Sequence, residues 1–216
     1  MPDWRNTRIV PMPPFLKGLA FGFVLAAIVG PMWVLCFRRT LAQGILAGFV
    51  SGMGIAAADG LYGAIAAFGL TAVSGFLLEH GFWLGLAGAA FLLWLGGQAL
   101  LAKPVSLDAA PGNAPSGSLA AAFGSTLALT LANPPTILAF AAIFAGLGLG
   151  ASASYTAAGL IVAGVVLGSA AWWVILALGA GWLRGRIGPG LARAVNVVSG
   201  LTILGFALWQ LATLLR

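Results

Sequence analysis

The chain has 216 residues, of which 61% are hydrophobic and only 6% are charged. Because a water-soluble domain usually carries about 25% charged residues, this composition excludes a soluble enzyme, a nucleic-acid-binding protein and a disordered protein. The net charge of +6 comes from basic residues that stand singly or in pairs between long apolar runs, as the loop residues of membrane proteins do.

Six apolar runs are long enough to be membrane spans. A helix needs about 20 apolar residues to cross a hydrocarbon core of about 30 Å. The predicted spans, in chain order, are residues 15–37, 43–73, 82–102, 119–149, 155–183 and 194–215. The second, fourth and fifth runs are longer than one crossing requires, so we expect tilted or broken helices there.

Two polar segments set the predicted domain organisation. Residues 1–14 contain four prolines and are predicted to be a disordered tail. Residues 103–118, with three prolines, two glycines and three serines, are predicted to be a flexible loop. This loop separates a first three-helix repeat (15–102) from a second (119–216). Since three spans is an odd number, the second repeat enters the membrane from the opposite side. The predicted fold is an all-α integral membrane protein with six transmembrane helices in two inverted repeats.

The first and fourth spans are each interrupted by proline about fifteen residues from their start, at Gly30-Pro31 and Asn133-Pro134. Proline removes a helical hydrogen bond but suits the first turn of a helix, and Asn is a strong N-cap. We therefore expect a second half-helix to begin at Pro31 and at Pro134, with free N–H groups that would bind a carboxylate. The alternative is an ordinary proline kink that neighbouring helices relieve.

Asp59 is the acidic residue near the middle of the second span. Apart from Lys17 at the start of the first span, no Lys, Arg or His lies inside a predicted span to pair with it. We therefore expect it to be protonated or to face water, with a proton or a cationic substrate group as its partner. The alternative is a neutral Asp59 bonded to a neighbouring helix through Ser125, Thr126 or Thr130. Tyr62 stands one turn from Asp59.

Other residues inside the spans are weaker candidates for a functional role. A packing role is predicted for the glycines of the ladder Gly44-x3-Gly48-x3-Gly52, because small residues let membrane helices approach closely. Glycine-rich faces of this kind also allow a homodimer. Four further side chains are predicted as possible cavity-lining residues, although packing or an interhelical hydrogen bond is the commoner role for such residues: Gln98, Thr130, Trp172 and Asn196.

Several motifs together resemble the LysE family of amino-acid exporters. Gly30-Pro31, the run from Gly52 to Tyr62 with Asp59 inside it, and Gly124-x8-Asn133-Pro134 appear in the family's order, and the resemblance extends over residues 15–215. It implies a six-helix inverted repeat, amino-acid efflux across the bacterial inner membrane in exchange for protons, and no cofactor. Family members often carry Lys after Asn-Pro, where this chain has Pro135, which leaves the substrate open.

The sequence therefore predicts a multi-pass secondary transporter of the bacterial inner membrane that exports amino acids or close derivatives by proton antiport. Asp59 is the predicted proton-coupling residue. The predicted substrate-binding residues are Gly30, Pro31, Asp59, Tyr62, Asn133 and Pro134. The alternatives are a metal-ion exporter on the same scaffold and a non-catalytic membrane subunit.

An enzyme is not expected, because no nucleophile stands near a base. No metal site is expected either, because Cys36 is the single cysteine. The predicted partners are an amino-acid substrate and the lipid bilayer, without nucleic acid. Six Lys and Arg residues in loops one, three and five, against four elsewhere, favour both termini outside.

Overall fold

The computed structural model describes residues 12–68, 79–101, 118–133, 136, 140, 154–184, 186 and 188–215. Apolar runs form the helices of this part of the chain, and proline stands at the start of three of them. In chain order they are α1 (Pro14–Ala27), α2 (Pro31–Gln43), α3 (Ile45–Ala67), α5 (Gly81–Leu101), α6 (Leu119–Leu131), α8 (Tyr155–Arg184) and α9 (Pro189–Leu214).

Four of these helices, α3, α5, α8 and α9, are long and apolar enough to cross a membrane. The helices α1 and α2 pass the same test of length and composition when taken together, as a broken span or a re-entrant segment bent by 75° at the break, and α6 is a shorter apolar helix. The chain is thus a multi-pass helical membrane protein. A complete sixth crossing would include residues 134–149, most of which lie outside the described residues, so the two inverted repeats stay a prediction.

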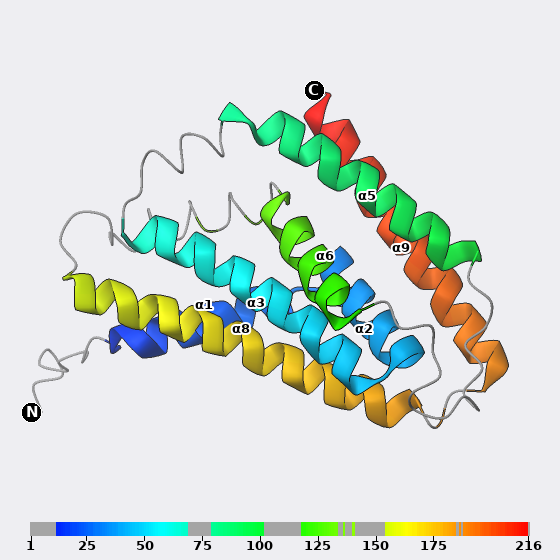
Figure 1. Ribbon diagram of the computed structural model, residues 1–216, viewed down its shortest axis with the longest axis horizontal. Helices are drawn as coiled ribbons and strands as arrows, with labels where there is room; N and C mark the ends of the chain where they lie inside the picture. The colour runs from blue at the N-terminus through cyan, green and yellow to red at the C-terminus, as the bar shows by residue number, and fades with distance from the viewer. Residues whose placement is uncertain are drawn as a thin grey trace, which may run out of the picture.

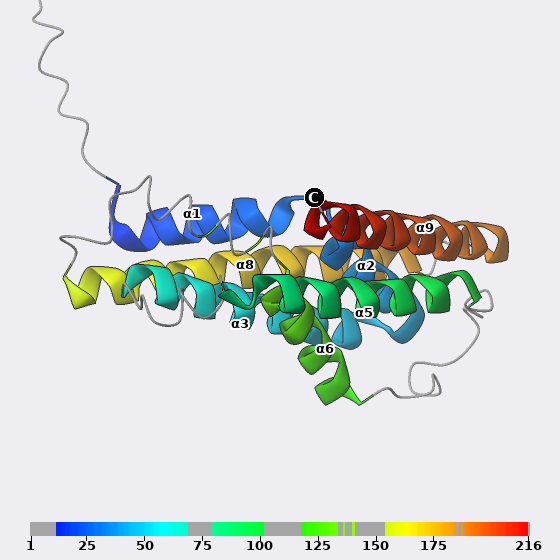
Figure 2. The ribbon, with the colours of Figure 1, turned by 90° about the horizontal axis from the view of Figure 1, so that it is seen from above.

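The helices form two groups, with the short helices α2 and α6 near the centre of the view (Figure 1). Along one side α1 packs on α8, and α3 packs on α8 and α6. On the other side α5 packs on α9. Helix α2 contacts α3, α8 and α9, so it ties the two groups together. Figure 2 shows α1 and α9 on one side of α8 and α6 on the opposite side.

Glycine lets α1 and α8 touch backbone to backbone. A Cβ atom at Gly18 or Gly22 of α1 would collide with backbone carbonyls of α8, and one at Gly164 or Gly168 of α8 would collide with backbone of α1. Since lipid supplies no hydrophobic force between helices, such close contact is a main source of their association. The spaced glycines of α1 and α8 therefore serve close helix packing.

The glycine ladder also packs, and its first member turns the chain. Gly48 lies against Thr40, and Gly52 lies against Trp173 of α8. Gly44 separates α2 from α3 with a φ of 99°, a conformation that an L side chain rarely adopts. This corner allows α3 to fold back directly onto α2.

The predicted end of the first span before Arg38 is wrong. Helix α2 continues through Arg38 and Arg39 to Gln43, and both arginines are half-buried rather than in a loop. The guanidiniums donate hydrogen bonds to neutral acceptors on neighbouring helices, so the two arginines are accommodated without ending the helix. Helix α9 likewise begins at Pro189 rather than at residue 194, because proline suits the first turn.

The predicted N-terminal tail and the predicted loop over 103–118 lie almost entirely outside the described residues. Pro14 already belongs to α1, and Ser118 caps α6 by accepting a hydrogen bond from the Ala121 N–H at 3.1 Å.

Candidate functional site

A cavity of about 300 Å³ lies where the α1–α2 break meets α3, α8, α9 and the end of α6. Its volume suits a small organic molecule. Most of its wall is apolar, with aromatic side chains from Trp33, Trp173, Phe206 and Trp209. The polar side chains in the wall are Asp59, Thr130, Asn133, Thr136 and Gln210.

The break between α1 and α2 opens a helix N-terminus into this cavity. Gly30 is the N-cap and makes no side-chain capping bond, and Pro31 is the first helical residue. The first backbone bond of α2 runs from the Val34 N–H to the Gly30 carbonyl at 3.1 Å. The N–H groups of Met32 and Trp33 precede it and have no helical acceptor, and both residues line the cavity. The half-helix predicted at Pro31 is confirmed.

Asp59 lies in the cavity wall and is nearly fully buried, with 3% of its surface exposed. Its Oδ2 accepts a hydrogen bond from Ser169 Oγ of α8 at 2.7 Å. The same Ser169 Oγ accepts a bond from Trp173 Nε1 at 3.2 Å. No Lys, Arg or His of the described chain lines this cavity, so the carboxyl group has polar neighbours but no counter-charge there.

The partners suggested for Asp59 on the fourth span are wrong. Thr126 Oγ1 donates to the Ser51 carbonyl at 2.7 Å, and Thr130 Oγ1 donates to the Thr126 carbonyl at 2.8 Å. Helix α6 crosses α3 at Gly54, where a Cβ atom would meet Thr126 and the Phe123 carbonyl. Asp59 comes five residues after Gly54, and five residues rotate a helix by about 500°. Asp59 therefore points away from the face that meets α6 and toward α8.

The second predicted break enters the same cavity. Helix α6 ends at Leu131, and Asn133 and Thr136 line the cavity wall. Asn133 Nδ2 donates to Thr136 Oγ1 at 3.0 Å, and the Thr136 N–H donates to the Asn133 carbonyl at 3.0 Å. Pro134 lies outside the described residues. The cavity thus brings together Gly30, Pro31, Asp59 and Asn133 with Thr130.

Four other predicted residues lie elsewhere. The Tyr62 hydroxyl donates to the Leu131 carbonyl at 2.6 Å, which ties α3 to the end of α6 outside the cavity wall. Trp172 packs edge to face on Phe23 and does not line this cavity. Gln98 lines a second cavity near α2, and Asn196 Oδ1 accepts a bond from Arg38 Nε at 3.3 Å.

Sequence reasoning assigned no role to Ser169, Trp173 or Gln210. Ser169 and Trp173 are one turn apart on α8, a spacing that places a serine and an indole on one face. Gln210 is buried, and its Nε2 donates to the Gly85 carbonyl of α5 at 2.7 Å. A polar residue inside an apolar span was the available signal for Ser169 and Gln210, but it does not say which cavity the side chain faces.

The sequence model of the family described as "LysE type translocator" matches residues 23–213. Over 205 residues the chain is 25% identical to a Bacillus subtilis (strain 168) protein named "Putative amino acid efflux protein YcgF", an alignment covering 90% of this chain and 93% of the relative. No solved structure matches the chain. Because the family match includes both breaks and the helix that carries Asp59, the chain belongs to the LysE family of translocators.

Proposed function

We propose that the protein exports amino acids across the bacterial inner membrane in exchange for protons. The observation that carries the proposal is the meeting of Asp59 with the start of α2 in one cavity. A carboxyl group and an uncapped helix N-terminus are complementary to the two charged groups that every free amino acid carries. Family membership and the name of the Bacillus relative support the same substrate class.

In this proposal the two ends of the cavity bind opposite charges. The substrate carboxylate accepts hydrogen bonds from the N–H groups of Met32 and Trp33, where the helix dipole is positive. The substrate ammonium group binds Asp59, which Ser169 orients from the other side. An Asp59 that holds a proton cannot also form an ion pair with the ammonium group. Mutual exclusion of proton and substrate at one carboxyl couples the two fluxes in opposite directions.

The wall of the cavity favours substrates with a neutral side chain. Asp59 is the acidic residue among the described cavity-lining residues, and the ammonium group common to all amino acids already requires it. Trp33, Trp173 and Phe206 offer apolar surface to the rest of the molecule. We therefore expect amino acids with apolar side chains to be exported in preference to lysine or arginine.

The distribution of charge supports the orientation proposed for export. Of the six Lys and Arg residues in the described part of the chain, Lys17 alone lies near the start of α1. The other five, Arg38, Arg39, Arg184, Arg186 and Arg193, lie at the opposite end of the helices. Positive residues favour the cytoplasmic side, so both termini face outward in this proposal.

Replacement of Asp59 tests the proposal. Purified protein in liposomes should transport radiolabelled leucine when a pH gradient drives the exchange. Asp59→Asn should abolish this gradient-driven flux, while the protein keeps its elution profile and helical content. Glu79→Gln is the matched control, because it removes an exposed carboxyl group outside the cavity. Unchanged proton-driven flux in Asp59→Asn would contradict the coupling role of Asp59. Flux by the purified protein alone would also exclude the alternative of a non-catalytic subunit.

A further inference from the structure

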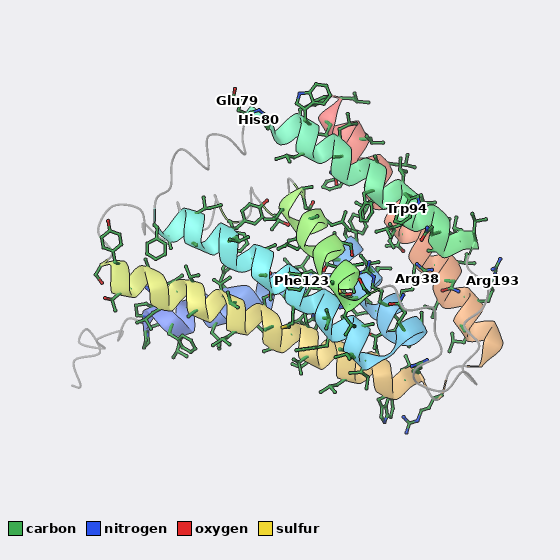
Figure 3. The ribbon with its side chains drawn as sticks, in the orientation of Figure 1. Arg38, Glu79, His80, Trp94, Phe123 and Arg193 are labelled. Carbon is green, nitrogen blue, oxygen red and sulfur yellow. The ribbon has the colours of Figure 1, made fainter. Side chains whose placement is uncertain are left out.

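A second cavity, of about 350 Å³, lies between α2, α5 and α6. It shares no lining residue with the Asp59 cavity. Its wall includes Arg38 and Arg39 together with the neutral polar side chains of Gln43, Gln98 and Ser125. Figure 3 shows Arg38 and Trp94, which also lines the cavity, on the same side of the molecule.

The two guanidinium groups carry positive charge that the surrounding protein does not neutralise. The acidic residues of the described chain are Asp59 and Glu79, and neither lines this cavity. Both arginines are half-buried, and half-buried charges in a membrane protein are costly unless they are paired. An anion in the cavity would relieve this cost and the repulsion between the two groups.

Hydrogen bonds to neutral acceptors hold both arginines in place. Arg39 Nη1 donates to Ser51 Oγ and to the Ala122 carbonyl, each at 3.0 Å. Its Nη2 donates to Ser125 Oγ at 2.8 Å, so Arg39 is fixed between α3 and α6. Arg38 Nε donates to Asn196 Oδ1 of α9 at 3.3 Å.

The terminal end of the Arg38 guanidinium remains available to a ligand. Its two terminal nitrogens make no hydrogen bond with any residue in the described ranges. A guanidinium that is held through Nε presents these nitrogens as a fork, which matches the two oxygens of a carboxylate or phosphate. Fixing the fork in advance reduces the entropy lost on binding.

We propose that Arg38 and Arg39 form a binding site for one oxyanion, a carboxylate or a phosphate, in the cavity between α2, α5 and α6. The anion is either the carboxylate of a soluble substrate or the phosphate of a lipid headgroup. Anion binding itself does not depend on the proposed function. Only its identification as a substrate carboxylate, bound on the side from which export begins, rests on the proposed amino-acid export.

The site is tested with the full chain in phosphatidylcholine nanodiscs. Acetate and inorganic phosphate are titrated at constant ionic strength, and binding is followed by the rise in thermal midpoint. Phosphatidylglycerol is then added to the discs, and lipid retention is followed by native mass spectrometry. We expect Arg38→Gln to weaken binding by about tenfold or more, the loss typical of a charge-assisted pair.

Two further variants keep the test decisive. Arg193→Gln removes one positive charge from an exposed position of α9 outside the cavity, and it should bind anions as the natural chain does. Gln98→Glu places a carboxylate in the cavity wall at an exposed residue, and it should abolish anion binding by occupying the arginines from within.

The outcomes separate the two sources of the anion. Arg38-dependent binding of acetate identifies a soluble carboxylate, whereas Arg38-dependent retention of phosphatidylglycerol alone identifies a lipid phosphate, and either result supports the site. Equal binding by Arg38→Gln and the natural chain, or no saturable binding of any of the three probes, would overturn it. Asp59→Asn should retain anion binding even if export is lost, so failure of the site and failure of the proposed export are distinguishable.

Discussion

A methyl group at Gly30 would project into open space. No atom lies within 4 Å of a Cβ built there, and the backbone φ of −154° is extended and open to any residue. Gly30 nevertheless lines the cavity beside the free N–H groups of α2. Glycine at this position therefore keeps the space in front of the helix terminus free, and the fold itself does not require it.

Gly30→Ala should fold normally but bind substrate less well. The added methyl group would occupy the space proposed for the substrate carboxylate, so we expect the KM for leucine export to rise by about tenfold, the effect of one misplaced methyl-sized group. Initial flux rates in liposomes measure this change. The matched control is Gly97→Ala on α5, where a Cβ atom also meets nothing within 4 Å but the cavity is remote. Equal KM values in the two variants would argue against the proposed carboxylate position.

The sequence indicates which residues carry chemistry better than it indicates their partners. Asp59, Gly30-Pro31 and Asn133 stand out because polar or helix-breaking residues are costly in an apolar span. The bond from Ser169 to Asp59 joins residues 110 positions apart. It depends on the rotation of α3 against α8, which the spacing along a single helix does not determine. The same reason explains why Thr126 and Thr130 were the wrong partners.

At the scale of the elements, glycine contact decides how α1 meets α8. Gly164 of α8 faces the backbone at Phe15 and Leu19 of α1, and a Cβ atom would be too close to both. Backbone atoms have no alternative rotamer, so an added methyl group must separate the two helices. By contrast, Gly159 on the same helix has nothing within 4 Å of its Cβ position.

Gly164→Ala should destabilise the protein, whereas Gly159→Ala should not. Overpacking a tight contact costs about 1–3 kcal/mol. Replacing an unconstrained helical glycine by alanine is neutral or stabilises by up to about 1 kcal/mol. The thermal midpoints of the two variants in the same detergent compare the effects directly. A Gly164→Ala midpoint equal to or above that of Gly159→Ala would contradict the close backbone contact.

Helix existence was predictable to a large extent, and helix ends were not. Apolar length alone predicts α3, α5, α8 and α9 as spans, and Pro31 predicts the start of α2. The prediction fails at Arg38 and Arg39, because the two charges do not end the helix there. A long side chain instead reaches hydrogen-bond acceptors on other helices, and these acceptors come from segments distant in the sequence.

At the scale of the whole molecule, the two cavities are separate and are lined by different parts of the helices. The Asp59 cavity meets the C-terminal part of α9 at Phe206 and Gln210, while the arginine cavity meets the N-terminal part of α6 at Ala121. One core cluster contributes residues to both walls, Met32 to the Asp59 cavity and Leu35 to the arginine cavity, and its members Leu92 and Leu129 line neither. Substrate passage in the proposed exporter therefore requires a rearrangement of this core.

The orientation proposed from charge can be measured with one introduced cysteine. The single native cysteine, Cys36, is fully buried, so it should react slowly with an impermeant maleimide. Arg186→Cys introduces a thiol at an exposed position next to the end of α8. We expect it to be labelled in inside-out vesicles and protected in intact cells. Labelling in intact cells would reverse the proposed orientation, and the natural chain provides the background.

The close backbone contact between α1 and α8 at their glycines has a consequence for movement. Two helices whose main chains touch along successive turns cannot tilt against each other without steric overlap, so we expect them to move as one rigid body. If the cavity opens, the backbone must then bend at the three residues that link α1 to α2. In the proposed exporter, this short connection, with Gly30 at its end, would be the hinge for access to Asp59.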